Sequence, residues 1–431
     1  MLPRKEYLDK LVRKKDNGRV KVITGLRRSG KSVLVFQLFR DYLLSEGVSK
    51  DQIIGLALDV YSNAKYRNPM ELDKYVRERI VDSVKRYYVL LDEIQYVSEI
   101  QNPYVDDPGS KITFIDVVLG LIQMSNVDVY VTGSNSKMLS SDILTEFRGR
   151  GDEIRVNPLS FSEFYNAYTG DKHDALQEYF TYGGMPLVMM QKTHEDKAAY
   201  LCDLFDKIYL DDIITRNSIG HAKSVLEDLL DVISSSVGSL TNPLKLSNTF
   251  ASVKKMSITD DTIAKYLDYF IDAFLLYKAQ RFDVKGRKYI GSPLKYYFSD
   301  IGLRNARLNF RQQEENHIME NIIYNELRYR DYSVDIGMVE YNHKNAERKS
   351  VRSQLEIDFV ANSGSDKLYI QSAFNVSDEE KRRQEVNSLK RINDSFRKIV
   401  VIKDNIIPWH DDDGIYYIGI EKFLLGEETG R

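Results

Sequence analysis

Short apolar runs separated by helical stretches dominate the first 157 residues of the chain. Four runs rich in β-branched, aromatic and leucine residues end at polar residues or glycine: Val20 to Thr24, Ile53 to Leu58, Tyr87 to Leu91 and Val127 to Thr132. Continuous apolar runs of this length are typical of parallel strands that are buried on both faces. The pattern predicts an α/β domain over residues 1–157, with a parallel sheet between two layers of helices.

The pattern becomes helical after this domain. A helical lid is predicted over residues 158–222, and a capping box from Ser160 to Glu163 opens it. In residues 223–305, helix-like pieces precede two strand-like runs joined by a basic turn, which is the element order of a winged helix.

The last part of the chain, residues 306–431, is predicted as a second α/β domain. A helix leads here into several strand-like runs. Between two of these runs, the polar segment Tyr341 to Gln354 is predicted as a solvated loop because it has little apolar content. The complete prediction is therefore an α/β multidomain protein with four domains.

Composition and charge exclude several classes of protein. The chain has 431 residues, of which 42% are hydrophobic and 29% charged, so it can build more than one packed core. The net charge of −3 excludes a polycation, and any contact with nucleic acid must come from a local patch. The one cysteine, Cys202, and the lack of a long apolar run predict a cytoplasmic protein with no membrane segment.

The segment after the first predicted strand fits the phosphate-binding P-loop at every fixed position. It lies between a strand and a helix, which is the context that this motif requires, and which argues against an accidental glycine-rich turn. Backbone amides would surround the phosphates of ATP, the lysine would reach the β and γ oxygens, and the last serine would bind Mg²⁺. The predicted nucleotide-binding residues are Gly25, Leu26, Arg27, Arg28, Ser29, Gly30, Lys31, Ser32 and Val33.

Two acids follow the third predicted strand, as an ATPase requires. We expect Asp92 to bind the magnesium ion and Glu93 to act as the general base on the attacking water. Alone, two acids at a strand end indicate a solvated terminus, but the P-loop upstream favours a Walker B motif. The pair predicts hydrolysis of ATP rather than binding alone.

Further candidate catalytic residues follow the fourth predicted strand. Ser134 and Asn135 could contact the γ-phosphate or the water, although a polar turn would use the same residues. In the segment after them, Arg148 or Arg150 could reach the nucleotide of a neighbouring subunit as an arginine finger. Solvated surface arginines are the alternative.

Taken together, these motifs resemble one family, the prokaryotic AAA-type ATPases that carry a carboxy-terminal nuclease-like domain. The resemblance rests on the P-loop, on Leu91 to Gln95, on Thr132 to Ser134, on Gly149 with Arg150, and on Asn157 to Glu163. It extends over nearly the whole chain through weaker motifs. The resemblance implies a homo-oligomer, with a ring as one form, in which nucleotide sites are shared between subunits and Arg150 matches the finger.

The same resemblance implies a restriction-endonuclease fold for the last domain, with a metal site that has lost two of its parts. Glu320 and Asp358 match the helix acid and the strand acid of such sites. Gln371 stands where the family has a further acid, and Ala373 stands where it has a lysine. A neutral amide and an alanine cannot hold a hard divalent ion or activate water, so we expect no nuclease activity.

The turn of the predicted wing is the candidate DNA contact. Its cations, Arg281, Lys285, Arg287 and Lys288, suit non-specific binding to phosphates, although a solvated basic hairpin is the alternative. The leading hypothesis is Mg-dependent ATP hydrolysis that drives a motor or conformational switch, with DNA or a protein as client. An ATP-gated nuclease, a scaffold that binds a protein partner and, more remotely, a small-molecule kinase are the alternatives.

Overall fold

The computed structural model describes residues 2–133, 147, 149–220, 223–286, 288–311, 314–344, 350–374 and 379–427. These residues divide into two compact units: Met1–Pro158 with Asp272–Phe274, and Leu159–Ile271 with Leu275–Arg431. The division after Pro158 lies one residue beyond the first predicted boundary, which follows residue 157. The boundaries predicted after residues 222 and 305 both fall inside the second unit.

A parallel sheet forms the centre of the first unit. Among the described residues it has five strands in the order β2-β3-β6-β1-β7, and every neighbouring pair is parallel. The strands are β1 (Val20–Thr24), β2 (Ile53–Ala57), β3 (Tyr87–Asp92), β6 (Val127–Thr132) and β7 (Gly151–Arg155). All residues of β1, β3 and β6 are buried, which explains their continuous apolar runs. The parallel α/β fold predicted for this part of the chain is confirmed.

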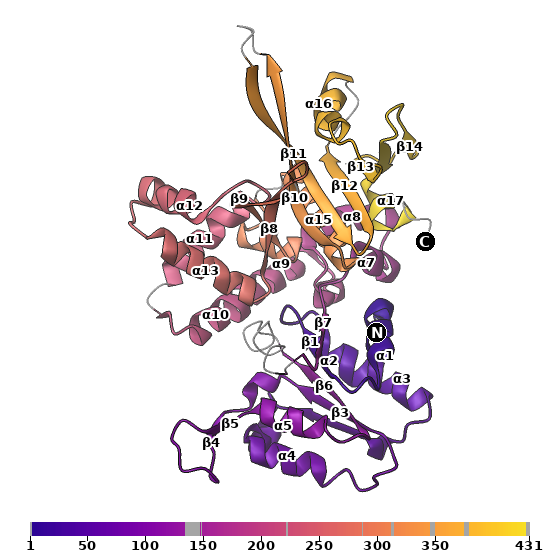
Figure 1. Cartoon of the computed structure of the whole chain (residues 1–431), viewed down its shortest axis with the longest axis vertical. Helices are drawn as coiled ribbons and strands as arrows, with labels where there is room; N and C mark the ends of the chain where they lie inside the picture. The colour runs from indigo at the N-terminus through magenta and orange to yellow at the C-terminus, as the bar shows by residue number, and fades with distance from the viewer. Residues whose placement is uncertain are drawn as a thin grey trace. The chain divides into compact units, whose positions relative to one another are not determined.

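Helices cover both faces of this sheet (Figure 1). They are α1 (Lys5–Lys14), α2 (Lys31–Val33), α3 (Arg40–Ser45), α4 (Pro69–Arg77) and α5 (Phe114–Leu121). Shorter helical segments are η1 (Leu34–Phe39), η2 (Lys50–Gln52), η3 (Tyr61–Arg67) and η4 (Ile94–Tyr96), and a small hairpin pairs β4 (Ile100–Gln101) with β5 (Lys111–Ile112). The helices and the sheet together make a three-layer unit.

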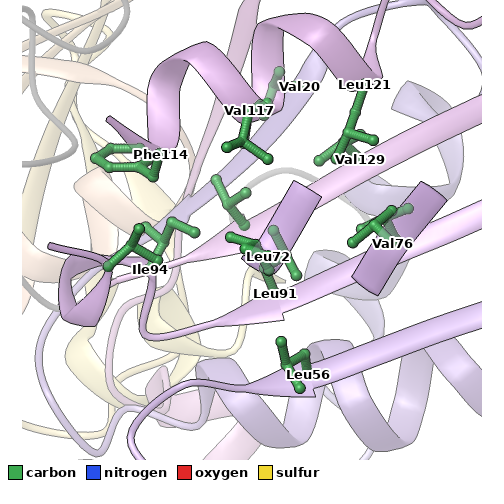
Figure 2. Packing of buried hydrophobic residues seen from close by; sticks show 14 of the residues in the cluster. Val20, Leu56, Leu72, Val76, Leu91, Ile94, Phe114, Val117, Leu121 and Val129 are labelled. Carbon is green, nitrogen blue, oxygen red and sulfur yellow. The ribbon is translucent and has the colours of Figure 1, made fainter. Parts of the chain in front are cut away.

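Alternate residues of each central strand belong to opposite cores. Val89 and Leu91 pack with side chains of α4 and α5, a cluster that Figure 2 shows from close by. Tyr88 and Leu90 pack instead with side chains of α1 and α3. This alternation follows from the two-residue period of a strand. Each fully buried aliphatic side chain contributes about 1.5–3 kcal/mol to stability, so the two cores fix the strand order firmly.

The second unit begins with helices. They are α7 (Phe161–Ala167), α8 (Ala175–Tyr182), α9 (His194–Asp203), α10 (Asp211–Arg216), α11 (Lys223–Ser235), α12 (Pro243–Thr249) and α13 (Asp260–Asp272), with η5 (Lys172–Asp174), η6 (Pro186–Met190), η7 (Leu204–Leu210) and η9 (Phe250–Lys254) between them. The predicted capping box is present at the start of α7: the Ser160 backbone N–H donates to Glu163 at 3.1 Å, and the Glu163 N–H donates to the Ser160 hydroxyl at 3.2 Å.

A mixed sheet forms the rest of the second unit. In the described part of the chain it has eight strands in the order β14-β15-β13-β12-β11-β10-β8-β9. The strands are β8 (Leu276–Asp283), β9 (Lys288–Phe298), β10 (Ser333–Lys344), β11 (Ser350–Ser363), β12 (Asp366–Ala373), β13 (Arg397–Ile402), β14 (Trp409–His410) and β15 (Tyr416–Gly419). The helices of this part are α14 (Ile301–Arg307), α15 (Glu315–Tyr329), α16 (Glu379–Lys390) and α17 (Ile420–Leu424).

Two features of this sheet differ from the prediction. The hairpin β8–β9, which we expected to be the wing of a separate domain, is the edge of the large sheet, because Arg281–Asp283 of β8 pair in parallel with Ile336–Met338 of β10. The predicted loop from residue 341 to 354 contributes to an antiparallel arm, in which Lys344 pairs with Ser350 (Figure 1). A two-stranded arm with solvent on both faces needs no apolar alternation, so its sequence has the polarity of a loop.

Candidate functional site

The P-loop connects the carboxyl end of β1 to the start of α2. Gly25 and Gly30 have φ angles of 129° and 98°, and Arg28 has 64°. A Cβ atom at Gly25 would lie 2.1 Å from the carbonyl oxygen of Val156, so no side chain fits at this position. The glycines therefore let the backbone turn tightly while its amides face the space before the helix.

Lys31 folds back over the loop that precedes it. Its buried ammonium donates to the carbonyl oxygens of Gly25 at 2.9 Å and Leu26 at 3.0 Å. Among the other residues predicted to bind nucleotide, Leu26 and Ser29 are buried, whereas Arg28, Ser32 and Val33 are exposed. A lysine held at two carbonyls of the loop is positioned to transfer those hydrogen bonds to phosphate oxygens.

An arginine that the sequence did not single out braces the loop from behind. The buried guanidinium of Arg4 donates to the carbonyl oxygen of Ser29 at 3.1 Å and to that of Asn157 at 2.7 Å. It also lies 4.6 Å from the ring centroid of Tyr7, whose hydroxyl accepts the N–H of Asn157. Arg4 thus ties the P-loop to the segment after β7. A lone arginine near the start of a chain gives no pattern from which this role could be predicted.

The Walker B acids lie at the carboxyl end of β3. Asp92 is buried, and burial raises the pKa of its carboxyl group above the usual value, although hydrogen bonds with Thr132 and Ser32 act in the opposite direction. Glu93 adopts a left-handed conformation with φ 53°, which turns its side chain out of the strand direction. The amide of Gln95 donates to the Glu93 carboxylate.

Thr132, at the end of β6, joins the two acids. Its hydroxyl donates to Asp92 and accepts the backbone N–H of Glu93 at 3.1 Å. Because β6 lies between β3 and β1 in the sheet, its carboxyl end lies between the acids and the P-loop. Ser32, Asp92, Thr132 and Glu93 therefore form one hydrogen-bonded chain. The sequence placed Thr132 at the right strand end but proposed its neighbours as the contacting residues.

The remaining predicted catalytic residues are placed only in part. Ser134, Asn135 and Arg148 lie outside the described residues. Arg150 is exposed and immediately precedes β7, whose first residue pairs with Val20 at the start of β1. The P-loop follows the carboxyl end of β1, whereas parallel strands all begin at the opposite edge of the sheet. Arg150 therefore lies at the edge away from the nucleotide site of its own unit.

The predicted remnant of a nuclease site forms a cluster in the second unit, built around a lysine. The Glu320 carboxylate accepts a hydrogen bond from Lys295 at 2.8 Å and one from the Tyr297 hydroxyl at 2.6 Å. Glu356 lies 2.7 Å from the same lysine nitrogen. Burial, followed by the charge of Glu320, raises the pKa of Asp358 well above its usual value. The prediction missed Lys295 and Glu356 as members of this cluster.

The two substituted positions are also defined. The Gln371 amide oxygen accepts the backbone N–H of Asp358 at 3.4 Å, and its nitrogen donates to Glu385 at 3.4 Å. Ala373 is buried in an apolar cluster with Val339 and Ile402. Within the described ranges, no group of three or more His, Cys, Asp or Glu side chains is arranged to hold a metal ion.

The structure describes the side chains of two of the four candidate DNA contacts. Arg281 is only 8% exposed, and its guanidinium donates to Gln354 at 3.2 Å, which corrects its assignment as a surface contact. Lys285 is exposed and donates to the carbonyl of Glu340 at 3.3 Å. Arg287 and the side chain of Lys288 lie outside the described part. The pairing of β8 with β10 buries Arg281, and the order of residues along the chain does not reveal that pairing.

Comparisons with known proteins agree with the fold and the P-loop. A family model described as an AAA domain matches residues 17–165, and one described as a domain of unknown function (DUF8612) matches residues 173–314. The fold, the P-loop and this match define the protein as a P-loop ATPase with an AAA domain. No helix of the described residues is long and apolar enough to cross a membrane.

Two relatives match nearly the whole chain. An uncharacterized protein of Haemophilus influenzae strain Rd is 34% identical over 430 residues, which is 99% of each chain. This chain belongs to the same family as that protein. An uncharacterized protein of Methanocaldococcus jannaschii is 28% identical over 95% of this chain and 85% of its own. A solved Walker-type ATPase of Pyrococcus abyssi is similar with a TM-score of 0.49 and 14% identity, over 72% of this chain and 96% of that one.

Proposed function

We propose that the chain hydrolyses ATP with Mg²⁺ and uses each turnover to drive a conformational switch. The observation that carries the proposal is the hydrogen-bonded chain Ser32–Asp92–Thr132–Glu93. It brings a candidate metal ligand from the P-loop helix, an acid from β3 and a hydroxyl from β6 to one sheet edge. Nucleotide binding alone would need only the P-loop, whereas hydrolysis also needs the acids.

The residues present fit a magnesium site and a triphosphate. Ser32 and Asp92 share a hydrogen bond, so both oxygens lie within reach of one ion. Burial, followed by the charges of Glu93 and Asp59, raises the pKa of Asp92. When bound, the ion would supply positive charge to the phosphate oxygens. Lys31 exchanges its loop carbonyls for phosphate oxygens, and the amides of residues 25–33 surround the phosphates.

Glu93 is the proposed general base. Thr132 accepts the backbone N–H of Glu93 and so fixes its backbone, while Gln95 donates a hydrogen bond to its carboxylate. Movement of Gln95 would release this carboxylate. A carboxylate in this position takes the proton of the attacking water. We propose that Ser134 or Asn135 senses the γ-phosphate after β6.

The finer parts of the proposal concern partners. Arg150 is exposed at the sheet edge opposite to its own P-loop, so a role as an arginine finger requires a second copy of the chain. We therefore propose a homo-oligomer, with a ring as one form. The client is DNA, bound non-specifically, or a protein. Of the described candidate cations on the hairpin turn, Lys285 is the exposed one.

Steady-state ATP hydrolysis tests the central proposal. Glu93→Gln is expected to keep nucleotide affinity and to lose turnover by about 100-fold or more, because the base is replaced by a neutral amide of the same shape. Lys31→Ala is expected to lose binding as well, and chelation of Mg²⁺ abolishes turnover of the wild type. Full turnover by Glu93→Gln would contradict the assignment.

A second measurement separates the clients. Stimulation of turnover by DNA that weakens steeply with salt supports a motor on nucleic acid. Turnover that is indifferent to DNA supports a protein-binding scaffold instead. Cleavage of DNA that depends on Asp358 would support the ATP-gated nuclease, which the buried carboxylate cluster argues against.

A further inference from the structure

The carboxylate cluster of the second unit is built around one ammonium group. Lys295 comes from β9, Glu320 from α15, and Glu356 and Asp358 from the same face of β11. The lysine nitrogen lies 2.8 Å from Glu320 and 2.7 Å from Glu356, and attraction to Asp358 adds to both. Burial alone would lower the pKa of Lys295, but the three carboxyl groups outweigh it and the pKa is raised. The two ion pairs at 2.8 and 2.7 Å thus favour the charged form of the lysine.

Most of this cluster is buried, although the Glu356 side chain is 30% exposed. Lys295 is 4% exposed, Asp358 is 9% exposed and Tyr297 is fully buried. Gly238 closes another side: a Cβ atom at this position would lie 3.2 Å from both carboxylate oxygens of Glu320. The burial of Asp358 and Glu320 leaves little room for a phosphodiester backbone at these two carboxyl groups.

One oxygen of each carboxyl group already has a partner. Glu320 Oε1 accepts from both Lys295 and Tyr297, and Asp358 Oδ2 accepts the backbone N–H of Ser372 at 2.8 Å. Mg²⁺ needs six oxygen ligands at about 2.0–2.1 Å in octahedral geometry. An ammonium group is a compact single charge with three donors and fits two carboxylates at hydrogen-bonding distance. The residues present therefore do not fit a divalent ion.

The cluster also joins parts of the sheet that do not pair with one another. In the strand order, β10 and β8 separate β11 from β9. Lys295 spans this separation on the side of the sheet that α15 covers, and it joins β9, β11 and the helix through three carboxyl groups. A bound metal ion could join these three elements only while it stayed bound.

We propose that Lys295 is a built-in cation that takes the place of a divalent metal ion in this cluster and locks the edge hairpin onto the rest of the sheet. The lock is independent of metal and holds the second unit in one arrangement. Removing the ammonium unlocks the hairpin and leaves three carboxyl groups that a metal ion then binds.

Manganese binding to nucleotide-free protein tests this proposal. Lys295→Met is expected to bind one Mn²⁺ per chain more than the wild type, measured by electron paramagnetic resonance of free Mn²⁺. Its thermal midpoint falls without Mn²⁺ and recovers with it, whereas the added Mn²⁺ leaves that of the wild type nearly unchanged. Lys285→Met, at an exposed lysine of the same hairpin, is the matched control and gains no ion.

Two further variants complete the test. Lys295→Met combined with Asp358→Asn is expected to lose the additional Mn²⁺. If Lys295→Met alone does not fold, Lys295→Met with Glu320→Gln must fold, because it removes opposite charges together; failure of both overturns the proposal. A wild-type protein that binds Mn²⁺ in a manner abolished by Asp358→Asn overturns it as well, as does a folded Lys295→Met that gains no ion.

Discussion

Thr132 and Asp92 lie on neighbouring strands and share a hydrogen bond in which the threonine hydroxyl is the donor. The same oxygen accepts the backbone N–H of Glu93, so a single side chain fixes both acids of the Walker B motif. The strand that carries Thr132 continues into the segment that holds Ser134 and Asn135. A shift of Thr132 on nucleotide binding would act directly on both acids.

Replacing Thr132 by alanine tests this coupling. Thr132→Ala removes a donor from a buried carboxylate, which contributes about 1.5–3 kcal/mol, and an acceptor from the neutral Glu93 N–H, which contributes about 0.5–1.5 kcal/mol. If these hydrogen bonds mainly stabilise the transition state, their loss is expected to lower kcat about 10- to 100-fold. Thr132→Ser keeps the hydroxyl and is expected to stay close to wild-type turnover. Equal rates for the two variants would contradict the role.

Arg4 is expected to affect nucleotide affinity. Arg4→Ala removes both hydrogen bonds that hold Ser29 and Asn157 together, so the P-loop loses its brace and KM for ATP rises several-fold with a smaller change in kcat. In Arg4→Lys the ammonium lacks the planar fork of a guanidinium and cannot donate to both carbonyls, so this variant is expected to recover the affinity for ATP only in part. Lys5→Ala, at the exposed neighbouring position, serves as the control. Unchanged affinity in a folded Arg4→Ala protein would exclude the brace.

The buried pair Lys21 and Asp128 in the first unit is expected to affect stability rather than catalysis. Lys21→Met leaves a buried carboxylate without its counter-ion, which typically costs about 3–5 kcal/mol. Adding Asp128→Asn removes the uncompensated charge and recovers part of the loss. Urea unfolding of both variants measures the effect. A double variant less stable than Lys21→Met would show that the charge is not the cause.

The buried Asp300 predicts a dependence of stability on pH. Burial raises its pKa from 3.8 to about 6, although the N–H groups of Gly184 and Leu303 donate to it at 2.7 and 3.1 Å. The folded state therefore binds the proton more tightly than the unfolded state. This contribution is complete below pH 4 and is lost as the pH rises through 6, an effect on the order of 3 kcal/mol.

Denaturant unfolding between pH 4 and 7 measures this effect. The stability of the wild type is expected to fall relative to that of Asp300→Asn as the pH rises, because asparagine does not titrate. Asp412→Asn, at an exposed site, keeps the wild-type profile and is the control. Parallel curves for wild type and Asp300→Asn would refute the assignment.

Features that depend on a few neighbouring residues, such as central strands and helix caps, could be predicted from the sequence. The strands at Val20 and Tyr87 and the capping box at Ser160 follow from runs and spacings of a few residues, and the structure has all of them. The edge strand β7 escaped prediction, because its charged residues do not have the apolar pattern of a central strand.

Contacts between distant residues could not be predicted. Lys295 and Arg281 have the same surroundings in the sequence as exposed wing residues, and only the pairing of β8 with β10 and the packing of α15 bury them. Likewise, Arg4 acquires its role from partners 25 and 153 positions away. The burial of a charge is decided by tertiary partners, which a single sequence does not show.

The pairing of β8 with β10 has a consequence for how this polypeptide can be divided. A cleavage between the two strands would leave each fragment with a row of unpaired backbone groups, which favours aggregation. Proteolysis there would thus yield no independent carboxy-terminal module. A truncation or gene fusion that separates the β8–β9 hairpin from the final hundred residues would expose the same backbone groups. We therefore expect the two segments to occur together in one polypeptide.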